Sequence, residues 1–184
     1  MIIYVHGFGG SGQGSKASAL RILLKDQNFI APSLSTIPDL AIATLCELIE
    51  TFQKYEKVYL IGSSLGGYYA LFLAQKYSIP AVLINPAIHP YVTLEPSLGE
   101  APSFYDLSSY EWRDTHLQML KNFETHNPDI TNYLLLLQKG DELLDYREAL
   151  KKLPGSRQIV EEGGDHSFVG IEKYAEIIIS FFKD

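Results

Sequence analysis

The sequence is poor in cysteine, in basic residues and in long apolar runs. Its single cysteine, Cys46, cannot form a disulfide within the chain, and it lies in an apolar stretch that favours a small buried side chain over a reactive thiol. No apolar run reaches the roughly 20 residues that a membrane-spanning helix needs. The 15 basic residues are outnumbered by 22 acidic ones, and this balance argues against a nucleic-acid partner. We therefore expect neither a membrane nor a nucleic acid as partner.

Motifs for metal ions and nucleotides are missing as well. The chain has five histidines, and none of them shows the H-x-x-x-H or H-E-x-x-H spacing of a metal site. His116 and His126 are expected on a solvated helix surface. The glycine-rich run at 7–14 is not followed by the G-K-S or G-K-T of a phosphate-binding loop. We expect no metal and no cofactor.

Length and composition indicate one folded domain. The 184 residues are 46% hydrophobic and 20% charged, which is typical of a globular chain large enough to bury its own core. The first six residues are apolar, but they lack the basic region and cleavage site of a signal peptide, so we expect a cytoplasmic protein. The sequence is compatible with a monomer or a homodimer.

Strand and helix patterns alternate along most of the chain. Strands are expected at 2–6, 28–33, 57–62, 80–85, 132–138 and 157–161. Helices are expected at 16–25, 37–55, 65–77, 146–153 and 169–182. Such alternation predicts an α/β fold: a six-stranded, mostly parallel sheet with helices on both faces.

The segment at about 89–128 interrupts this alternation. It is rich in proline, serine, glutamate and aromatic residues, and we expect one helix in it, at 110–124. A connection of this length in a compact domain is usually functional, and its aromatic side chains need an apolar surface to cover. The sequence therefore predicts a cap or lid insertion on a single domain. A solvated insertion that only packs is the alternative.

The most informative motif is Gly62-Ser63-Ser64-Leu65-Gly66, which is G-x-S-x-G between a predicted strand and a predicted helix. That context is typical of a nucleophile elbow, where a sharp turn lifts the serine above the sheet edge. The strained turn crowds any side chain two positions away, and glycine relieves this crowding. Ser64 is the predicted nucleophile.

A serine needs a base, and the base needs a carboxylate that orients it. His166 follows the last predicted strand in a glycine-rich turn, where it could lean toward Ser64. Asp141 directly follows the leucine-rich strand at 132–138, while Asp145 and Asp165 are rival carboxylates. Position favours Asp141, and the chain order Ser64, Asp141, His166 is the order of the α/β-hydrolase triad.

The developing oxyanion needs two donors. One is expected to be the backbone N–H of Leu65, directly after the nucleophile. The other is expected from the glycine-rich loop after the first strand, where we assign the N–H of Phe8 and keep Gly9 as the alternative. His6 is expected to support this loop rather than to act as a second base.

Five segments together resemble the α/β-hydrolase superfamily and, more closely, the small YqiA-type bacterial serine esterases. They are YVHGF at 4–8, IGSSLGGYYA at 61–70, LINPA at 83–87, QKGDELLDY at 138–146 and GGDHSF at 163–168. The resemblance implies a minimal fold that lacks the first two antiparallel strands of larger hydrolases. It also implies activity on short-chain acyl esters and acyl thioesters. The chain departs from the family in its looser glycine-rich start, and in His89, where an arginine is expected.

We therefore expect a carboxylic ester hydrolase that works through an acyl-enzyme. The alternatives are an acyl thioesterase, which would use the same groups, and a non-catalytic binding module built on a hydrolase fold. Tyr68 and Tyr69 open the helix after the elbow, and one of them could line an acyl pocket, although core packing explains both equally well.

Overall fold

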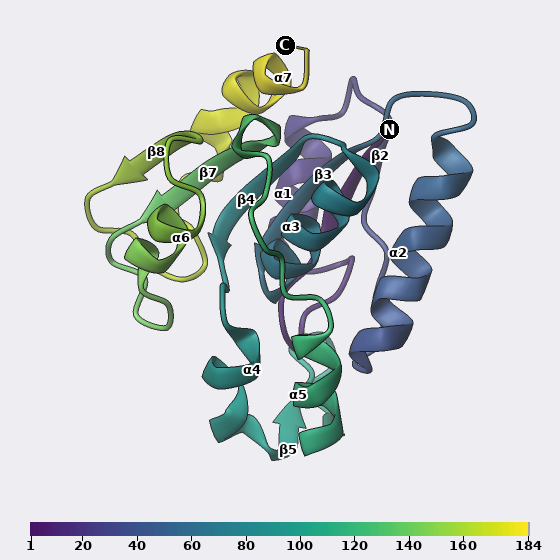
Figure 1. The fold of residues 1–184 in the computed structure, drawn as a ribbon, viewed down its shortest axis with the longest axis vertical. Coiled ribbons are helices and arrows are strands. Elements are labelled where there is room, and N and C mark those ends of the chain that lie inside the picture. Colours follow the sequence, from purple (N-terminus) through teal and green to yellow (C-terminus); the bar gives the residue numbers. More distant parts are fainter. Residues whose placement is uncertain (184) are drawn as a thin grey trace.

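The computed structural model describes residues 1–183 and is centred on a sheet of six parallel strands (Figure 1). The strands are β1 (Ile2–Val5), β2 (Phe29–Ile30), β3 (Tyr59–Ser64), β4 (Ala81–Pro86), β7 (Tyr133–Gln138) and β8 (Arg157–Glu161). Their order is β2-β1-β3-β4-β7-β8, and every neighbouring pair is parallel. The predicted six-stranded sheet is therefore confirmed.

The central strands are buried on both faces. Every residue of β4 and β7 is buried, which explains why their sequences are continuous apolar runs instead of alternating patterns. Because all six strands point the same way, the side chains that follow them meet at one edge of the sheet. Ser64 ends β3, and Asp141 follows β7 by three residues.

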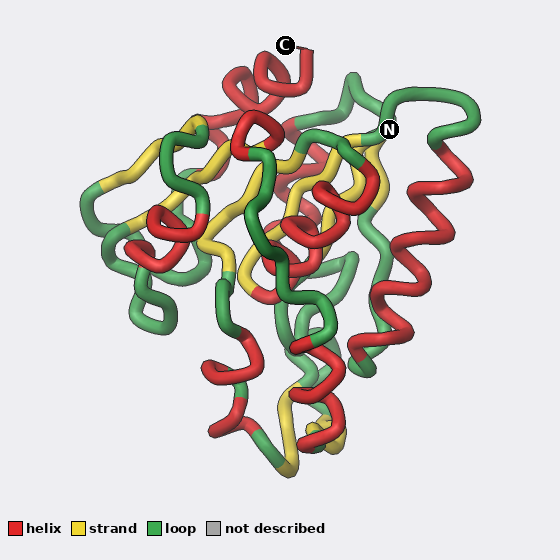
Figure 2. Tube along the Cα trace, in the orientation of Figure 1, coloured by secondary structure: helices red, strands yellow, loops and turns green. Residues whose placement is uncertain are grey.

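Helices cover both faces, as the tube in Figure 2 shows. On one face, α1 (Ser15–Leu23) and α7 (Ala175–Lys183) pack against Tyr4 and Ile61. On the other face lie α2 (Pro38–Phe52), α3 (Leu65–Tyr77) and α6 (Tyr146–Lys152). The predicted α3 has the observed bounds. The final helix differs, because it begins with a 3-10 turn, η3 (Ile171–Tyr174).

The insertion between β4 and β7 projects from the sheet on the side away from the termini (Figure 1). It contains α4 (Pro90–Thr93), η1 (Glu95–Ser97), β5 (Gly99–Pro102), β6 (Ser109–Trp112), α5 (Asp114–Lys121) and η2 (Ile130–Asn132). β5 and β6 form an antiparallel hairpin.

The helix expected at 110–124 is wrong at both ends. Residues 109–112 belong to β6, and the helix spans only Asp114–Lys121. The alternating pattern of β6 buries Trp112 and half-buries Tyr110, with exposed residues between and before them, so tertiary contacts override the helical reading.

Two histidines and the cysteine also differ from expectation. His116 is buried, and its Nδ1 accepts a hydrogen bond from the Arg113 N–H at 3.2 Å, so it caps α5 instead of facing solvent. Burial lowers the pKa of His116. His126 is exposed but lies outside any helix. Cys46 is only partly buried, and its sulfur accepts a hydrogen bond from the Lys76 ammonium at 3.3 Å.

Candidate active site

Ser64 occupies a backbone conformation that non-glycine residues seldom adopt, with φ 56° and ψ −124°. It joins β3 directly to α3. A Cβ atom on Gly62 would lie 2.2 Å from the Gly66 carbonyl oxygen, and one on Gly66 would lie 2.0 Å from the Val5 carbonyl oxygen. Only glycine fits at these two positions, so the G-x-S-x-G spacing follows from the packing of the turn.

The strained serine is held by its neighbours on both sides. The Ser64 carbonyl accepts a hydrogen bond from the Ala87 N–H at 3.0 Å, just beyond the end of β4. The 13-residue helix α3 starts at the next residue, so the positive end of its dipole lies at the serine. Strain of this kind concentrates at functional sites, where the surrounding structure maintains it.

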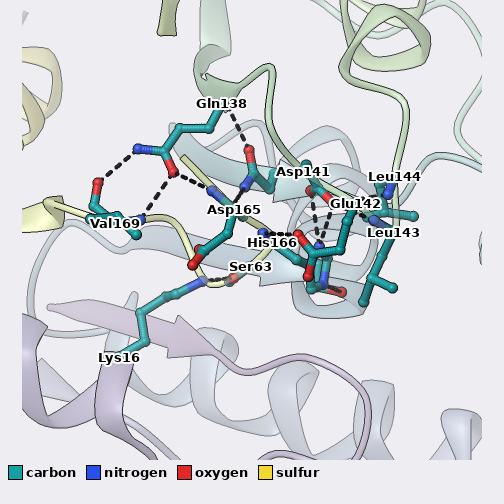
Figure 3. A network of polar contacts seen from close by, with 12 residues as sticks. Lys16, Ser63, Gln138, Asp141, Glu142, Leu143, Leu144, Asp165, His166 and Val169 are labelled. Atoms are coloured by element: carbon teal, nitrogen blue, oxygen red, sulfur yellow. Dashed lines mark hydrogen bonds and ion pairs between the residues drawn. The ribbon is translucent and has the colours of Figure 1, made fainter. Parts of the chain in front are cut away.

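The structure brings the three predicted side chains into one line. His166 Nε2 lies 3.0 Å from Ser64 Oγ. His166 Nδ1 lies 2.9 Å from Asp141 Oδ2 and 3.0 Å from Asp141 Oδ1 (Figure 3). Residues separated by 102 and 25 positions in the chain thus meet at hydrogen-bonding distances. The geometry allows Nδ1–H to donate to the carboxylate while Nε2 accepts from the serine.

The Asp141 carboxylate is fixed by backbone amides as well as by the histidine. Its Oδ1 accepts hydrogen bonds from the N–H groups of Leu143 and Leu144, both at 2.9 Å, and its side chain is 2% exposed. Burial by itself raises the pKa of Asp141, but the hydrogen bonds from His166, Leu144 and Leu143 lower it by more. The net effect is a lowered pKa, so the carboxylate is ionised at neutral pH.

Neither of the two rival carboxylates is hydrogen-bonded to the imidazole of His166 within residues 1–183. Asp145 caps α6: it accepts from the Arg147 N–H at 3.0 Å and pairs with the guanidinium of the same residue. Asp165 precedes the histidine, and its side chain does not contact the imidazole; its Oδ1 is buried without a hydrogen-bond partner among residues 1–183. Neither competes with Asp141 for the imidazole.

The loop that carries His166 is anchored by two amide side chains that the sequence analysis did not single out. Gln138 Oε1 accepts from the N–H groups of Asp165 (3.2 Å) and Val169 (3.0 Å), and its Nε2 donates to the Val169 carbonyl at 2.7 Å (Figure 3). Asn85 Nδ2 donates to the Asp165 carbonyl at 3.0 Å, and Asn85 Oδ1 accepts from the Gln138 N–H. Both amide side chains lie at the ends of strands, and this position in the sequence is the signal that could have identified them.

The glycine-rich loop after β1 approaches the serine from the other side. A Cβ on Gly7 would lie 3.1 Å from Ser64 Cβ. His6 supports this loop: its Nε2 accepts from the Leu34 N–H at 2.9 Å, and its Nδ1 lies 2.9 Å from the Gly7 carbonyl. Burial lowers the pKa of His6, so the ring is neutral, with Nδ1–H donating to Gly7.

The insertion packs on this same loop. The Phe8 ring meets Trp112 and Tyr110 edge-on, with ring centroids 4.9 and 5.8 Å apart. The Phe104 N–H donates to the Gly9 carbonyl at 2.8 Å, and a Cβ on Gly9 would lie 2.4 Å from the Pro102 carbonyl oxygen. The insertion therefore fixes the backbone around Phe8.

Two hollows flank Phe8. A cleft of about 310 Å³ is bordered by Ser64 and His166 and extends toward α1. A smaller cavity of about 60 Å³ lies beneath the insertion, bordered by Leu65, Tyr69 and Trp112 among others. Tyr69 thus borders a cavity, whereas the Tyr68 hydroxyl donates to the Leu120 carbonyl at 2.7 Å within the core.

One further charged group borders the larger cleft. Lys16, in the first turn of α1, donates from Nζ to Ser63 Oγ at 2.6 Å. Burial lowers the pKa of Lys16 to about 8, although the carboxylates of Asp141 and Asp165 oppose this shift. No motif in the sequence points to this residue.

In the described part of the chain, no cluster of histidine, cysteine and carboxylate side chains is arranged to hold a metal ion. Within residues 1–183, none of the helices combines the length and apolarity needed to cross a bilayer.

Comparisons with solved structures identify the fold. Est1E from Butyrivibrio proteoclasticus, solved with ferulic acid bound, aligns with a TM-score of 0.75 at 12% identity, over 100% of this chain and 89% of that one. The alpha/beta hydrolase domain-containing protein 10 from mouse aligns with a TM-score of 0.72 at 20% identity, over 100% and 88%. The predicted α/β-hydrolase fold is therefore confirmed.

Comparisons of sequence identify the family. The UPF0227 protein YcfP of Salmonella paratyphi A is 27% identical over 98% of each chain, and the UPF0227 protein of Citrobacter koseri is 26% identical over the same shares. The family model described as "Uncharacterised protein family (UPF0227)" matches residues 1–183. The chain belongs to the UPF0227 family and has the α/β-hydrolase fold.

Proposed function

We propose that this protein is a serine hydrolase that cleaves short-chain acyl esters through an acyl-enzyme. The observation that carries the proposal is the line of Ser64, His166 and Asp141, with 3.0 Å between serine and imidazole and 2.9 Å between imidazole and carboxylate. A serine hydroxyl becomes an effective nucleophile when a base accepts its proton and a carboxylate stabilises the resulting imidazolium.

In the first half-reaction, Ser64 Oγ attacks the ester carbonyl while His166 Nε2 takes the hydroxyl proton. Asp141, ionised at neutral pH, holds the Nδ1–H tautomer and stabilises the positive ring. The imidazolium then protonates the leaving alcohol, and the acyl group stays on Ser64. In the second half-reaction, water loses a proton to His166 and attacks the acyl-enzyme, which releases the acid.

The tetrahedral oxyanion requires donors, which we assign to the backbone N–H groups of Leu65 and Phe8. Leu65 is the first residue of α3, so its N–H points out of the helix start, where the dipole favours negative charge. The close approach of Gly7 to Ser64 supports the assignment of Phe8, because it brings the loop next to the nucleophile. One such donor is worth on the order of 3 kcal/mol to the transition state.

The small cavity beneath the insertion supports a short acyl group. Its volume of about 60 Å³ leaves room for a few carbon atoms beside Leu65. The insertion from about 89 to 128 would then act as a cap over this acyl site, on a single domain. Similarity in fold to an esterase and to lipolytic enzymes adds support for ester substrates.

The test compares Ser64→Ala with Ser180→Ala, a matched change on the exposed side of α7. We expect wild type and Ser180→Ala to hydrolyse 4-nitrophenyl acetate and to be labelled by a fluorophosphonate. Ser64→Ala should lose at least about 10³-fold of the rate and all labelling, since the nucleophile is gone. Undiminished turnover by folded Ser64→Ala would rule out this mechanism. Absence of turnover and of labelling in wild type would favour a binding module.

A further inference from the structure

The larger cleft contains a cation that the ester mechanism does not use. Lys16 borders the same cleft as Ser64 and His166, and it belongs to α1. Figure 3 shows the side chain extending toward Ser63 and the loop that carries Asp165 and His166. Its hydrogen-bond partner, Ser63, immediately precedes the proposed nucleophile Ser64 in the chain.

The hydrogen-bonding capacity of this ammonium is only partly used. A lysine carries three N–H donors. Among residues 1–183, the acceptor of Lys16 is Ser63 Oγ, at 2.6 Å. The Lys16 side chain, which carries the other two N–H donors, is partly buried and borders the cleft. A partly desolvated charge with free donors is stabilised most by an oxygen that carries a charge of the opposite sign.

We propose that Lys16 forms a subsite for an anionic group of the substrate, a carboxylate or a phosphate, in the cleft beside Ser64. This inference rests on the proposed function, because it names the substrate class of the same site. The substrate would be an ester with a neutral short acyl or alkyl arm on one side and an anionic arm on the other. Lys16 would therefore determine specificity, without taking part in proton transfer.

The charges around Lys16 indicate that an anionic substrate group would be bound by direct contact with the ammonium. The chain as a whole carries a net charge of −7, and the Asp141 and Asp165 carboxylates, in the loops after β7 and β8, interact electrostatically with the lysine. Asp141 is already engaged by His166 and two backbone amides. A general positive field is therefore absent, and an anion would bind through short hydrogen bonds to the ammonium itself.

The two carboxylates also keep the ammonium available. Burial lowers the pKa of Lys16 to about 8, and Asp141 and Asp165 limit this decrease, so the side chain is mostly charged at pH 7. The other titratable side chains that border the cleft are Tyr4, His6 and His166. Burial raises the pKa of Tyr4 and lowers that of His6, so both are neutral in this range. The subsite would accordingly weaken as the pH rises above about 8.

The experiment measures a selectivity ratio, so that any general loss of activity cancels. The first pair of substrates is mono-4-nitrophenyl glutarate and its neutral counterpart 4-nitrophenyl pentanoate, so the charge is on the acyl arm. The second pair is 3-carboxy-4-nitrophenyl acetate against 4-nitrophenyl acetate, which places it on the leaving group. Each kcat/KM ratio is measured for wild type, Lys16→Met, Lys16→Arg and the exposed control Lys54→Met, with spontaneous hydrolysis subtracted.

For one of the two pairs, we expect Lys16→Met to lower the ratio by about tenfold or more, the size expected for a lost charged hydrogen bond. Lys16→Arg should retain most of the preference, and Lys54→Met should change nothing. The wild-type ratio should fall between pH 7 and pH 9, whereas that of Lys16→Arg should not. Unchanged ratios for both pairs in Lys16→Met would overturn the proposal.

Failure of the subsite can be separated from failure of the proposed function. If wild type hydrolyses no ester, the esterase proposal fails by itself. Calorimetric titration of monomethyl glutarate into wild type and Lys16→Met still reports on the subsite in that case. Binding to wild type that is lost in Lys16→Met supports the anionic subsite, and absent or equal binding contradicts it.

Discussion

The two regions on either side of Ser64 are held in different ways. The base side, named for the proposed base, consists of Asp141 and the loop carrying His166. It is fixed by hydrogen bonds that backbone N–H groups donate to the Asp141 carboxylate and to the amide oxygen of Gln138 at a strand end. The oxyanion side, named for the donor proposed there, is the glycine-rich loop around Phe8. The rings of Tyr110 and Trp112 from the insertion pack on it, and hydrogen bonds of His6 and Gly9 add to this packing. Hydrogen bonds from several groups hold the loop of the proposed base, whereas ring packing together with hydrogen bonds holds the loop around Phe8.

This difference fits the demands of the proposed chemistry. Proton transfer depends on the tautomer and the angle of one imidazole, and hydrogen bonds specify both. A backbone donor needs only a rigid loop at the right place, which ring packing on Phe8 helps to provide. The base side should therefore be sensitive to small polar changes, and the oxyanion side to loss of volume.

The largest effect is expected on the base side, from Asp141→Asn. The amide would favour the wrong imidazole tautomer and would not stabilise the imidazolium, so we expect kcat to fall by about 10⁴-fold with the fold retained. Asp145→Asn is the matched control, because Asp145 caps α6 and does not contact His166. Steady-state hydrolysis of 4-nitrophenyl acetate measures both. Equal losses in the two variants would contradict the assignment of Asp141.

On the oxyanion side, Trp112→Ala should act first on stability. The side chain is 1% exposed and packs on Phe8 and His116, so its removal should cost about 3–5 kcal/mol of unfolding free energy. Tyr105→Ala removes an aromatic ring from the same insertion, but that ring is 68% exposed, and a change within about 0.5 kcal/mol is expected. Urea unfolding measures both. Similar values would show that the insertion is not held by its buried rings.

The sequence predicted which three side chains meet at the edge of the sheet, namely Ser64, Asp141 and His166. A parallel sheet sends all its strand ends to one edge, so Ser64, Asp141 and the loop of His166 could be placed together from chain order alone. Glycine is required at 62 and 66 because a Cβ atom at either position would clash with a backbone carbonyl oxygen. A motif of this kind can be recognised in the sequence even though one of its limits, the approach of Val5 to Gly66, is a tertiary contact.

The rest of the site depends on contacts that the sequence does not display. The four-residue strand β6 forms because Trp112 packs on Phe8, more than 100 positions earlier, and its local pattern resembled a helix. Gln138 is the last residue of a buried strand and reads as its polar end. Lys16 is the first residue of a predicted helix, and only the fold places it at the cleft. Each role is created by tertiary proximity.

Gln138→Met tests whether the amide anchor matters to the base side. Methionine keeps the volume but leaves the N–H groups of Asp165 and Val169 without their acceptor, which should cost about 1–3 kcal/mol of unfolding free energy. A looser His166 should also lower kcat, with a smaller change in KM. Gln158→Met, on the exposed face of β8, is the control for the residue type. A normal kcat in folded Gln138→Met would show that the Gln138 anchor is not needed to position the imidazole.

The smallest effect concerns stability in acid. Because the folded-state pKa of Asp141 lies below its ordinary value of about 3.9, the ionised carboxylate stabilises the fold at pH values above that. This contribution is lost as the pH falls through the lower folded-state pKa. Urea unfolding between pH 6 and pH 2.5 should therefore show a steeper loss of stability in wild type than in Asp141→Asn, which has no group to protonate there. Parallel curves would mean that the hydrogen bonds from His166, Leu143 and Leu144 orient Asp141 without favouring its charged form, and the polar character assigned to the base side would then reflect geometry alone.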